Sequence, residues 1–184
     1  MKGSHMSSIS TSKVKDCIRN IPDFPKPGIL FRDITPVLKD AALFQETLDW
    51  FEDQLSDMGV EYLIGIESRG FIIAAALAER MKVGFVPARK MGKLPGLVER
   101  HKYDLEYGSD CIEMHADAFP PGSKIAIIDD LLATGGTAMA TVSLAQKLQG
   151  QIVSILFMIE LAPIGGRKSL PPEIPTHSMI VYTY

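Results

Sequence analysis

The apolar residues of this chain follow two spacings, one typical of a helix and one typical of buried strands. Between residues 41 and 58 they recur every three or four positions, which predicts a helix with one buried face. Four short apolar runs, rich in β-branched residues, follow at helix-sized intervals: residues 62–66, 83–88, 125–128 and 152–159. This order predicts an α/β fold, with a mostly parallel, twisted sheet and helices on both faces.

Other segments do not fit this alternation. Residues 14–20 favour a short helix, whereas the prolines that follow predict that residues 21–36 are extended and irregular. Residues 90–103 mix glycine, proline and charged side chains without a regular period, which predicts a long exposed loop. Alternating apolar and polar positions over residues 104–115 predict a pair of strands outside the main sheet.

Composition and charge limit the class of protein. The 184 residues are 46% hydrophobic and 22% charged, and no apolar run is long enough to span a membrane. A net charge of -3 supplies no positive field for a nucleic-acid backbone, so we expect neither a nucleic-acid nor a membrane partner. Cys17 and Cys111 lie far apart, which predicts free thiols in a reducing, cytoplasmic compartment. Residues 1–6 resemble an expression-tag remnant, which leaves one expected domain over residues 7–184.

Residues 124–137 carry the most informative chemistry. A buried-strand run ends in Asp129 and Asp130, and a loop rich in glycine and threonine then leads into a helix. Ligands bind beyond the carboxyl ends of parallel strands, and Gly135 and Gly136 let backbone N–H groups turn toward an anion at the helix N-terminus. We therefore expect a phosphate cradle. The acids suit the hydroxyls of a ribose 5-phosphate and a positive charge developing at its anomeric carbon. No lysine follows Gly136, so the segment is not a P-loop.

Several motifs, in the same order, resemble those of one family. IIDDLLATGGT at residues 127–137 is similar to the phosphoribosyl-diphosphate (PRPP) binding motif of type I phosphoribosyltransferases. FPKPGILFRDITPVLKD (24–40), GIESRGF (65–71), RKMGKLPG (89–96) and LEYG (105–108) resemble the adenine-specific members. The resemblance implies that family's fold and the conversion of adenine and PRPP to AMP and pyrophosphate. It also implies a small N-terminal hood at about residues 21–36 and a flexible catalytic loop, the lid, at about residues 89–103.

The resemblance further implies a PRPP site. The ribose 5-phosphate would be held by Asp129, Asp130, Ala133, Thr134, Gly135, Gly136 and Thr137, and the pyrophosphate by Glu67, Ser68, Arg69, Gly70, Arg89 and Lys93. A non-proline cis peptide is expected near Glu67 and Ser68. Mg²⁺ is implied as cofactor, bound mainly through PRPP near Asp129 and Asp130, with no dedicated protein ligand.

Adenine is the second substrate that the resemblance implies. Phe31 of the hood would stack on the base, the backbone of Leu30 and Arg32 would bind its edge, and Leu161 would pack on its other side. Glu106 would exchange a proton with N7 of the purine. The implied catalytic residues are Glu106, Arg69, Lys93, Asp129 and Asp130. A homodimer is implied because the lid arginine, Arg89, can serve a neighbouring subunit in this family.

Some features depart from the family or leave alternatives open. Lys102 and Tyr103 stand where members often have a Ser-Tyr pair, and the preceding residues 98–101 also differ. A transferase for 6-oxopurines usually recognises its base with a lysine late in the chain, whereas the hood motif favours adenine. A non-catalytic PRPP-binding regulator needs a basic DNA-binding helix, for which this chain has neither the length nor the charge.

Overall fold

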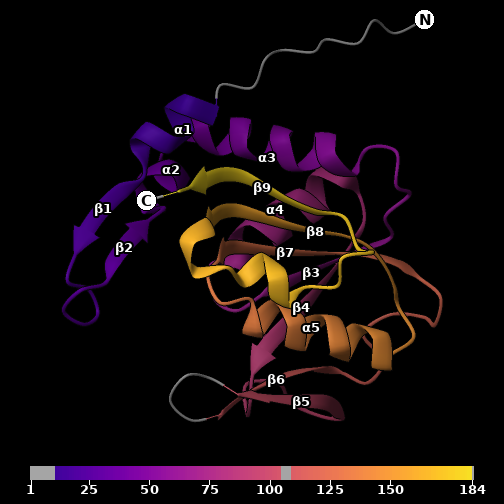
Figure 1. The fold of residues 1–184 in the computed structure, drawn as a ribbon. Helices are drawn as coiled ribbons and strands as arrows, with labels where there is room; N and C mark the ends of the chain where they lie inside the picture. The colour runs from indigo at the N-terminus through magenta and orange to yellow at the C-terminus, as the bar shows by residue number, and fades with distance from the viewer. Residues whose placement is uncertain (1–10, 105–108, 184) are drawn as a thin grey trace, which may run out of the picture. The chain divides into compact units, whose positions relative to one another are not determined.

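A seven-stranded sheet organises Gln54–Tyr184, one of the two compact units into which the chain divides; the other is Met1–Asp53. The computed structural model describes residues 11–104 and 109–183. The strand order in the sheet is β5-β6-β4-β3-β7-β8-β9 (Figure 1). The prediction of a single domain over residues 7–184 stays a prediction.

The four predicted apolar runs form four strands of the parallel part of this sheet, and no run predicted the fifth, at residues 176–182. Its strands are β4 (Gly84–Lys90), β3 (Tyr62–Ile66), β7 (Lys124–Leu132), β8 (Gln151–Leu161) and β9 (Thr176–Tyr182). Each pairs in parallel with the next in that order. Residues such as Ile64, Ile127 and Phe157 are fully buried in the hydrophobic core, which explains why these strands are continuously apolar. The predicted α/β architecture is confirmed.

The two helices of this unit that connect parallel strands determine where a ligand would bind. Helix α4 (Gly70–Met81) leads from β3 to β4, and α5 (Gly136–Lys147) leads from β7 to β8. The two connections run in opposite directions along the sheet, so right-handed crossovers place the helices on opposite faces. The direction in which the strands are added to the sheet therefore reverses between β3 and β7. In such sheets, ligands bind in the crevice beyond the carboxyl ends of the two strands at the reversal, which is the expected ligand site here.

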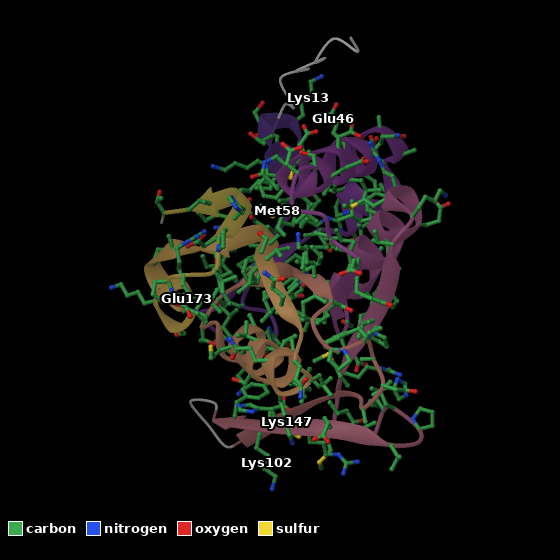
Figure 2. The ribbon with its side chains drawn as sticks, turned by 90° about the vertical axis from the view of Figure 1, so that its right-hand side faces the viewer. Lys13, Glu46, Met58, Lys102, Lys147 and Glu173 are labelled. Atoms are coloured by element: carbon green, nitrogen blue, oxygen red, sulfur yellow. The ribbon has the colours of Figure 1, made fainter. Side chains whose placement is uncertain are left out.

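An antiparallel hairpin extends one side of the sheet. Strand β5 (Val98–Asp104) pairs with β6 (Ser109–His115), and β6 pairs antiparallel with Arg89 and Lys90 at the end of β4. The predicted loop over residues 90–103 is therefore wrong from residue 98 onward. The pair of strands predicted within residues 104–115 is also wrong, because this stretch supplies β6, which pairs with β5 and with β4 and so belongs to the main sheet. Edge strands are often rich in charged side chains, which discourage pairing with another chain, so a stretch of mixed charges can form one. Lys102, for example, projects outward from the hairpin (Figure 2).

The Met1–Asp53 unit contains a second, two-stranded sheet. Its elements are α1 (Thr11–Cys17), β1 (Arg19–Pro22), β2 (Leu30–Asp33), α2 (Thr35–Lys39) and most of α3 (Ala41–Leu55). Strands β1 and β2 pair antiparallel. The turn between them contains a cis Phe24–Pro25 bond, and the Gly28 N–H donates to Asp23 Oδ1 at 2.7 Å.

Several predicted boundaries in this first unit need correction. The short first helix ends at Cys17 rather than at residue 20, and α3 ends at Leu55 rather than at residue 58. Residues 21–36 are not wholly irregular, because strand pairing satisfies the backbone groups on either side of the prolines. Among the described residues, no helix is long and apolar enough to cross a membrane.

Candidate active site

The loops that follow β3 and β7 meet where the strand order reverses. Arg69, at the start of α4, forms an ion pair with Asp130 of β7, with 2.6 Å between Nη2 and Oδ2. Gly70 allows this close approach, since a Cβ atom there would lie 2.8 Å from Asp129 Oδ1 and 2.9 Å from the Ile128 carbonyl oxygen. The predicted non-proline cis peptide is confirmed between Glu67 and Ser68 in the same loop.

Asp129 and Asp130 lie within β7, which continues to Leu132, and not after the strand as predicted. Burial and the adjacent Asp130 carboxylate raise the pKa of Asp129 well above its usual range. Burial also raises the pKa of Asp130, although the Arg69 guanidinium opposes this shift. Carboxyl groups that are poorly solvated in this way gain from hydrogen-bond donors or positive charge brought by a ligand.

A small cavity follows β7 at the N-terminus of α5. Its volume is about 80 Å³, and it is lined by Asp129 and by residues 131–138. Gly135 has φ 81°, a left-handed conformation that glycine adopts without steric cost, and α5 begins at the next residue. The first N–H groups of a helix have no acceptor within the helix and attract anions. The cavity therefore has the position and polarity of the predicted phosphate cradle.

The hairpin contacts residues that line this cavity through Tyr103, for which the sequence indicated no role. Its hydroxyl lies 3.1 Å from Thr137 Oγ1 and donates to Asp110 Oδ2 at 3.3 Å. Asp110 in turn pairs with Lys90 Nζ at 3.2 Å. Burial raises the pKa of Tyr103, so this hydroxyl stays protonated at neutral pH. A chain of polar contacts through Tyr103 and Asp110 thus connects Thr137, a predicted phosphate ligand, with Lys90 at the end of β4.

Two predicted pyrophosphate ligands bind each other in this structure. Arg89 donates from Nε to Glu67 Oε2 at 3.2 Å and from Nη2 to Glu67 Oε1 at 3.0 Å. Arg89 also donates to the Lys93 carbonyl oxygen, and the Lys90 N–H donates to Glu67 at 3.1 Å. The Arg89 hydrogen bonds hold the pKa of Glu67 below its usual value. Glu67 therefore fixes the first part of the lid.

The segment after Lys90 is anchored by an acid that sequence reasoning missed. Glu113 of β6 is fully buried and accepts the N–H groups of Lys93 and Leu94 at 3.0 Å each and Arg100 Nε at 3.0 Å. Burial opposes its ionisation, but these donors outweigh burial and hold the pKa of Glu113 below its usual value. The alternating pattern of β6 could indicate an inward-facing position, but not the lid backbone as its partner.

The residues expected to bind adenine come from separate segments of the chain. Leu30, Phe31 and Arg32 lie on β2 of the first unit, where Phe31 packs edge-on against Phe24 at 5.1 Å between ring centroids. Leu161 is half-buried at the end of β8 in the second unit. Glu106 lies outside the described residues. Within residues 11–104 and 109–183, no group of three His, Cys, Asp or Glu side chains is placed to hold a metal ion.

Comparison with known proteins identifies the family. The model of the phosphoribosyl transferase domain matches residues 42–167. An adenine phosphoribosyltransferase of Prochlorococcus marinus (strain MIT 9313) is 52% identical over 170 residues, which cover 92% of this chain and 99% of that protein. The chain belongs to the phosphoribosyltransferase family. The family expected from the motifs is therefore confirmed.

Solved structures of phosphoribosyltransferases share this fold. Adenine phosphoribosyltransferase from Rhodothermus marinus DSM 4252 is 44% identical, with a TM-score of 0.91 over 95% of this chain and 99% of that chain. The enzyme from Saccharomyces cerevisiae is 38% identical, with a TM-score of 0.88 over 95% of this chain and 99% of that chain. That yeast structure is a complex with D-2,5-dideoxy-2,5-imino-altritol 1,6-bisphosphate and adenine.

Proposed function

We propose that this phosphoribosyltransferase transfers the phosphoribosyl group of PRPP to adenine, giving AMP and pyrophosphate. The observation that carries the proposal is the similarity to adenine phosphoribosyltransferases over nearly the whole chain, including the yeast enzyme that was solved in complex with a bisphosphate and adenine. The cavity after β7 and the acids beside it support a ribose 5-phosphate as one part of the substrate.

The phosphate of PRPP would lie in the cavity formed by residues 133–137. Backbone N–H groups at the start of α5 and the hydroxyls of Thr134 and Thr137 would donate to its oxygens. Asp129 and Asp130 would accept the 2′ and 3′ hydroxyls of the ribose. Their carboxylates would also stabilise the positive charge that develops at the anomeric carbon as the leaving group departs.

The pyrophosphate would lie at the loop after β3. Arg69 and the N-terminus of α4 face this loop, and Arg89 and Lys93 stand at the start of the lid. Together they would neutralise the departing group, with the backbone of Glu67, Ser68 and Gly70 donating where it is accessible. Mg²⁺ fits this charge pattern, because poorly solvated carboxyl groups lie next to a phosphate site. Asp129 and Asp130 would help to hold Mg²⁺ bound to PRPP, where it would supply further positive charge.

The base would be held by the hood and would attack the anomeric carbon of PRPP through its imidazole ring. Phe31 would stack on adenine, Leu30 and Arg32 would bind its edge, and Leu161 would pack on the opposite face. Nitrogen N9 forms the new bond to the anomeric carbon while the bond from that carbon to pyrophosphate oxygen breaks. The proton that adenine loses passes from N7 to Glu106, which acts as a general base in this direction and as a general acid in reverse.

We also propose that the protein is a cytoplasmic homodimer. Cys17 and Cys111 are both free thiols, which suits a reducing compartment. A dimer would let Arg89 of one subunit serve the other's site, in exchange for its pairing with Glu67 of its own chain. Sedimentation of the purified protein tests this directly, since a monomer over the whole working concentration range excludes a shared arginine.

The deciding experiment is an assay with PRPP and Mg²⁺, offering adenine, hypoxanthine and guanine separately and following nucleotide and pyrophosphate together. We expect AMP and pyrophosphate in equal amounts from adenine and little product from the other bases. Turnover of a 6-oxopurine in place of adenine would refute the base assignment. Binding of PRPP without turnover of any base would instead indicate a regulator. Neither alternative receives support from the relatives described above, all of which are adenine phosphoribosyltransferases.

A further inference from the structure

A segment about 30 residues after the phosphate loop in the sequence packs directly on that loop. Residues 165–169, here called the support segment, lie between β8 and β9 and include the short helical turn η2 (Gly166–Ser169), which follows η1 (Ala162–Ile164). A Cβ atom on Gly135 would lie 2.5 Å from the Gly166 carbonyl oxygen, and a Cβ atom on Gly166 would lie 2.1 Å from the Ala133 carbonyl oxygen. The two backbones therefore touch, and only glycine fits at either position.

A hydrogen bond fixes the same contact. Ser169 Oγ donates to the Thr134 carbonyl oxygen at 3.2 Å. That carbonyl belongs to the loop that lines the 80 Å³ cavity. The support segment thus contacts the phosphate loop, but none of its residues lines the cavity where the phosphate would lie.

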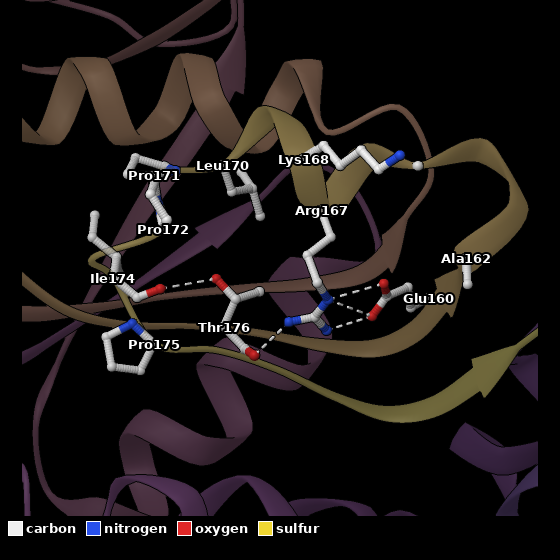
Figure 3. Close-up of a pocket in the computed structure, with 11 residues that line it drawn as sticks. Glu160, Ala162, Arg167, Lys168, Leu170, Pro171, Pro172, Ile174, Pro175 and Thr176 are labelled. Carbon is white, nitrogen blue, oxygen red and sulfur yellow. Dashed lines mark hydrogen bonds and ion pairs between the residues drawn. The ribbon is translucent and has the colours of Figure 1, made fainter.

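The support segment is itself anchored to the sheet through Arg167. Its guanidinium donates to both carboxylate oxygens of Glu160, a buried residue of β8, and to the Thr176 carbonyl oxygen and Ser178 Oγ of β9. Figure 3 shows Arg167 between Glu160 and Thr176. Ser178 Oγ completes the cluster by donating to Glu160 at 2.7 Å. One cluster therefore ties β8, β9 and the support segment together.

We infer that Gly166, Ser169 and Arg167 are positioning residues for the 5-phosphate of the substrate. They touch no substrate atom; they set the conformation of residues 133–135, whose N–H groups must converge on the phosphate. The inference rests on the proposed function, because it takes this loop as the phosphate site. Without these contacts, the loop would bind the 5-phosphate more weakly, whereas the affinity for adenine would not change.

The test compares three variants with the wild type for binding of ribose 5-phosphate and, separately, of adenine, by calorimetry. Ser169→Ala removes one hydrogen bond and should weaken ribose 5-phosphate binding about fivefold. Gly166→Ala forces the two backbones apart and should weaken it by more than about tenfold. Lys168→Ala is the matched control, because Lys168 is exposed and lies in the same short helical turn as both residues. It should bind both ligands as the wild type does.

The ligand dependence separates positioning from general damage. Steady-state kinetics should show a raised KM for PRPP and an unchanged KM for adenine in Ser169→Ala. Wild-type affinity for ribose 5-phosphate in folded Ser169→Ala overturns the inference, and so does an equal loss of both ligands. If Gly166→Ala does not fold, Ser169→Ala decides alone. A wild-type protein that binds ribose 5-phosphate but forms no AMP refutes the proposed function and leaves this comparison intact.

Discussion

The buried carboxylate of Glu113 should determine how firmly the beginning of the lid is attached to the sheet. Its Oε1 accepts two backbone N–H groups, from Lys93 and Leu94, at 3.0 Å each. A hydrogen bond to a charged group contributes about 1.5–3 kcal/mol, and the lower figure applies because Lys93 is exposed to water. Loss of these two bonds in Glu113→Ala should therefore cost about 3 kcal/mol, and the lost hydrogen bond to Arg100, whose side chain is 55% exposed, adds less. Glu113→Gln keeps a neutral acceptor and should cost about 1 kcal/mol.

Thermal unfolding followed by circular dichroism tests these values. For a chain of this size, about 3 kcal/mol corresponds to a decrease in Tm of roughly 6–12 °C. Glu79→Ala is the control, because Glu79 and its partner Lys82 are both 76% exposed, and its Tm should equal that of the wild type. Glu113→Ala should also raise the KM for PRPP, since Lys93 belongs to the same segment. A Tm for Glu113→Ala equal to that of the control would refute this account of the lid.

Four other changes test separate parts of the structure. Glu160→Gln removes a carboxyl group whose pKa is held below 4.5 in the folded protein by its hydrogen bonds to Arg167. The Tm of this variant should therefore be lower than that of the wild type above about pH 5.5, and the difference should disappear as the pH falls through the pKa of Glu160 in the folded protein. Gly70→Ala should cost about 2 kcal/mol in denaturant unfolding, because its Cβ would lie 2.8 Å from Asp129 Oδ1; unchanged stability would contradict that packing. Asp130→Ala should lower kcat/KM for PRPP on the order of 10²-fold, and near-normal kinetics would remove it from the site. Glu106→Ala should lower kcat more than it raises the KM for PRPP, because N7 is remote from the phosphates; a pure PRPP-binding defect would contradict its role.

The central sheet could be predicted because its strands are buried on both faces. Ile125, Ile127 and Phe157 leave a continuous apolar signal that needs no partner to be recognised. Strand β5 could not be found in this way, since its residues take their conformation from pairing with β6 and not from burial. Local sequence carries little of that information, and a stretch of mixed charges therefore resembled a loop.

The site was predictable where chemistry lies in one continuous motif and obscure where it depends on tertiary contacts. The order Asp129, Asp130, Gly135, Gly136 contains a strand end, two acids and a helix start within a few residues. Ser169 donates a hydrogen bond to the same loop although it lies 35 residues further along the chain, and the sequence around Ser169 does not indicate this contact. The Gly165-Gly166 pair was the one available signal, because adjacent glycines often mark a close backbone approach.

The pairing of Arg69 with Asp130, and of Arg89 with Glu67, has a consequence for turnover. A pyrophosphate group that takes these arginines must first displace carboxylates already bound to them, so the empty protein competes with its own ligand. This competition lowers the affinity for any polyanion, because only the difference between two sets of ion pairs remains as binding free energy. When pyrophosphate departs, the same carboxylates can form their ion pairs with the arginines again. A site lined with unpaired cations would bind its product more tightly and release it more slowly.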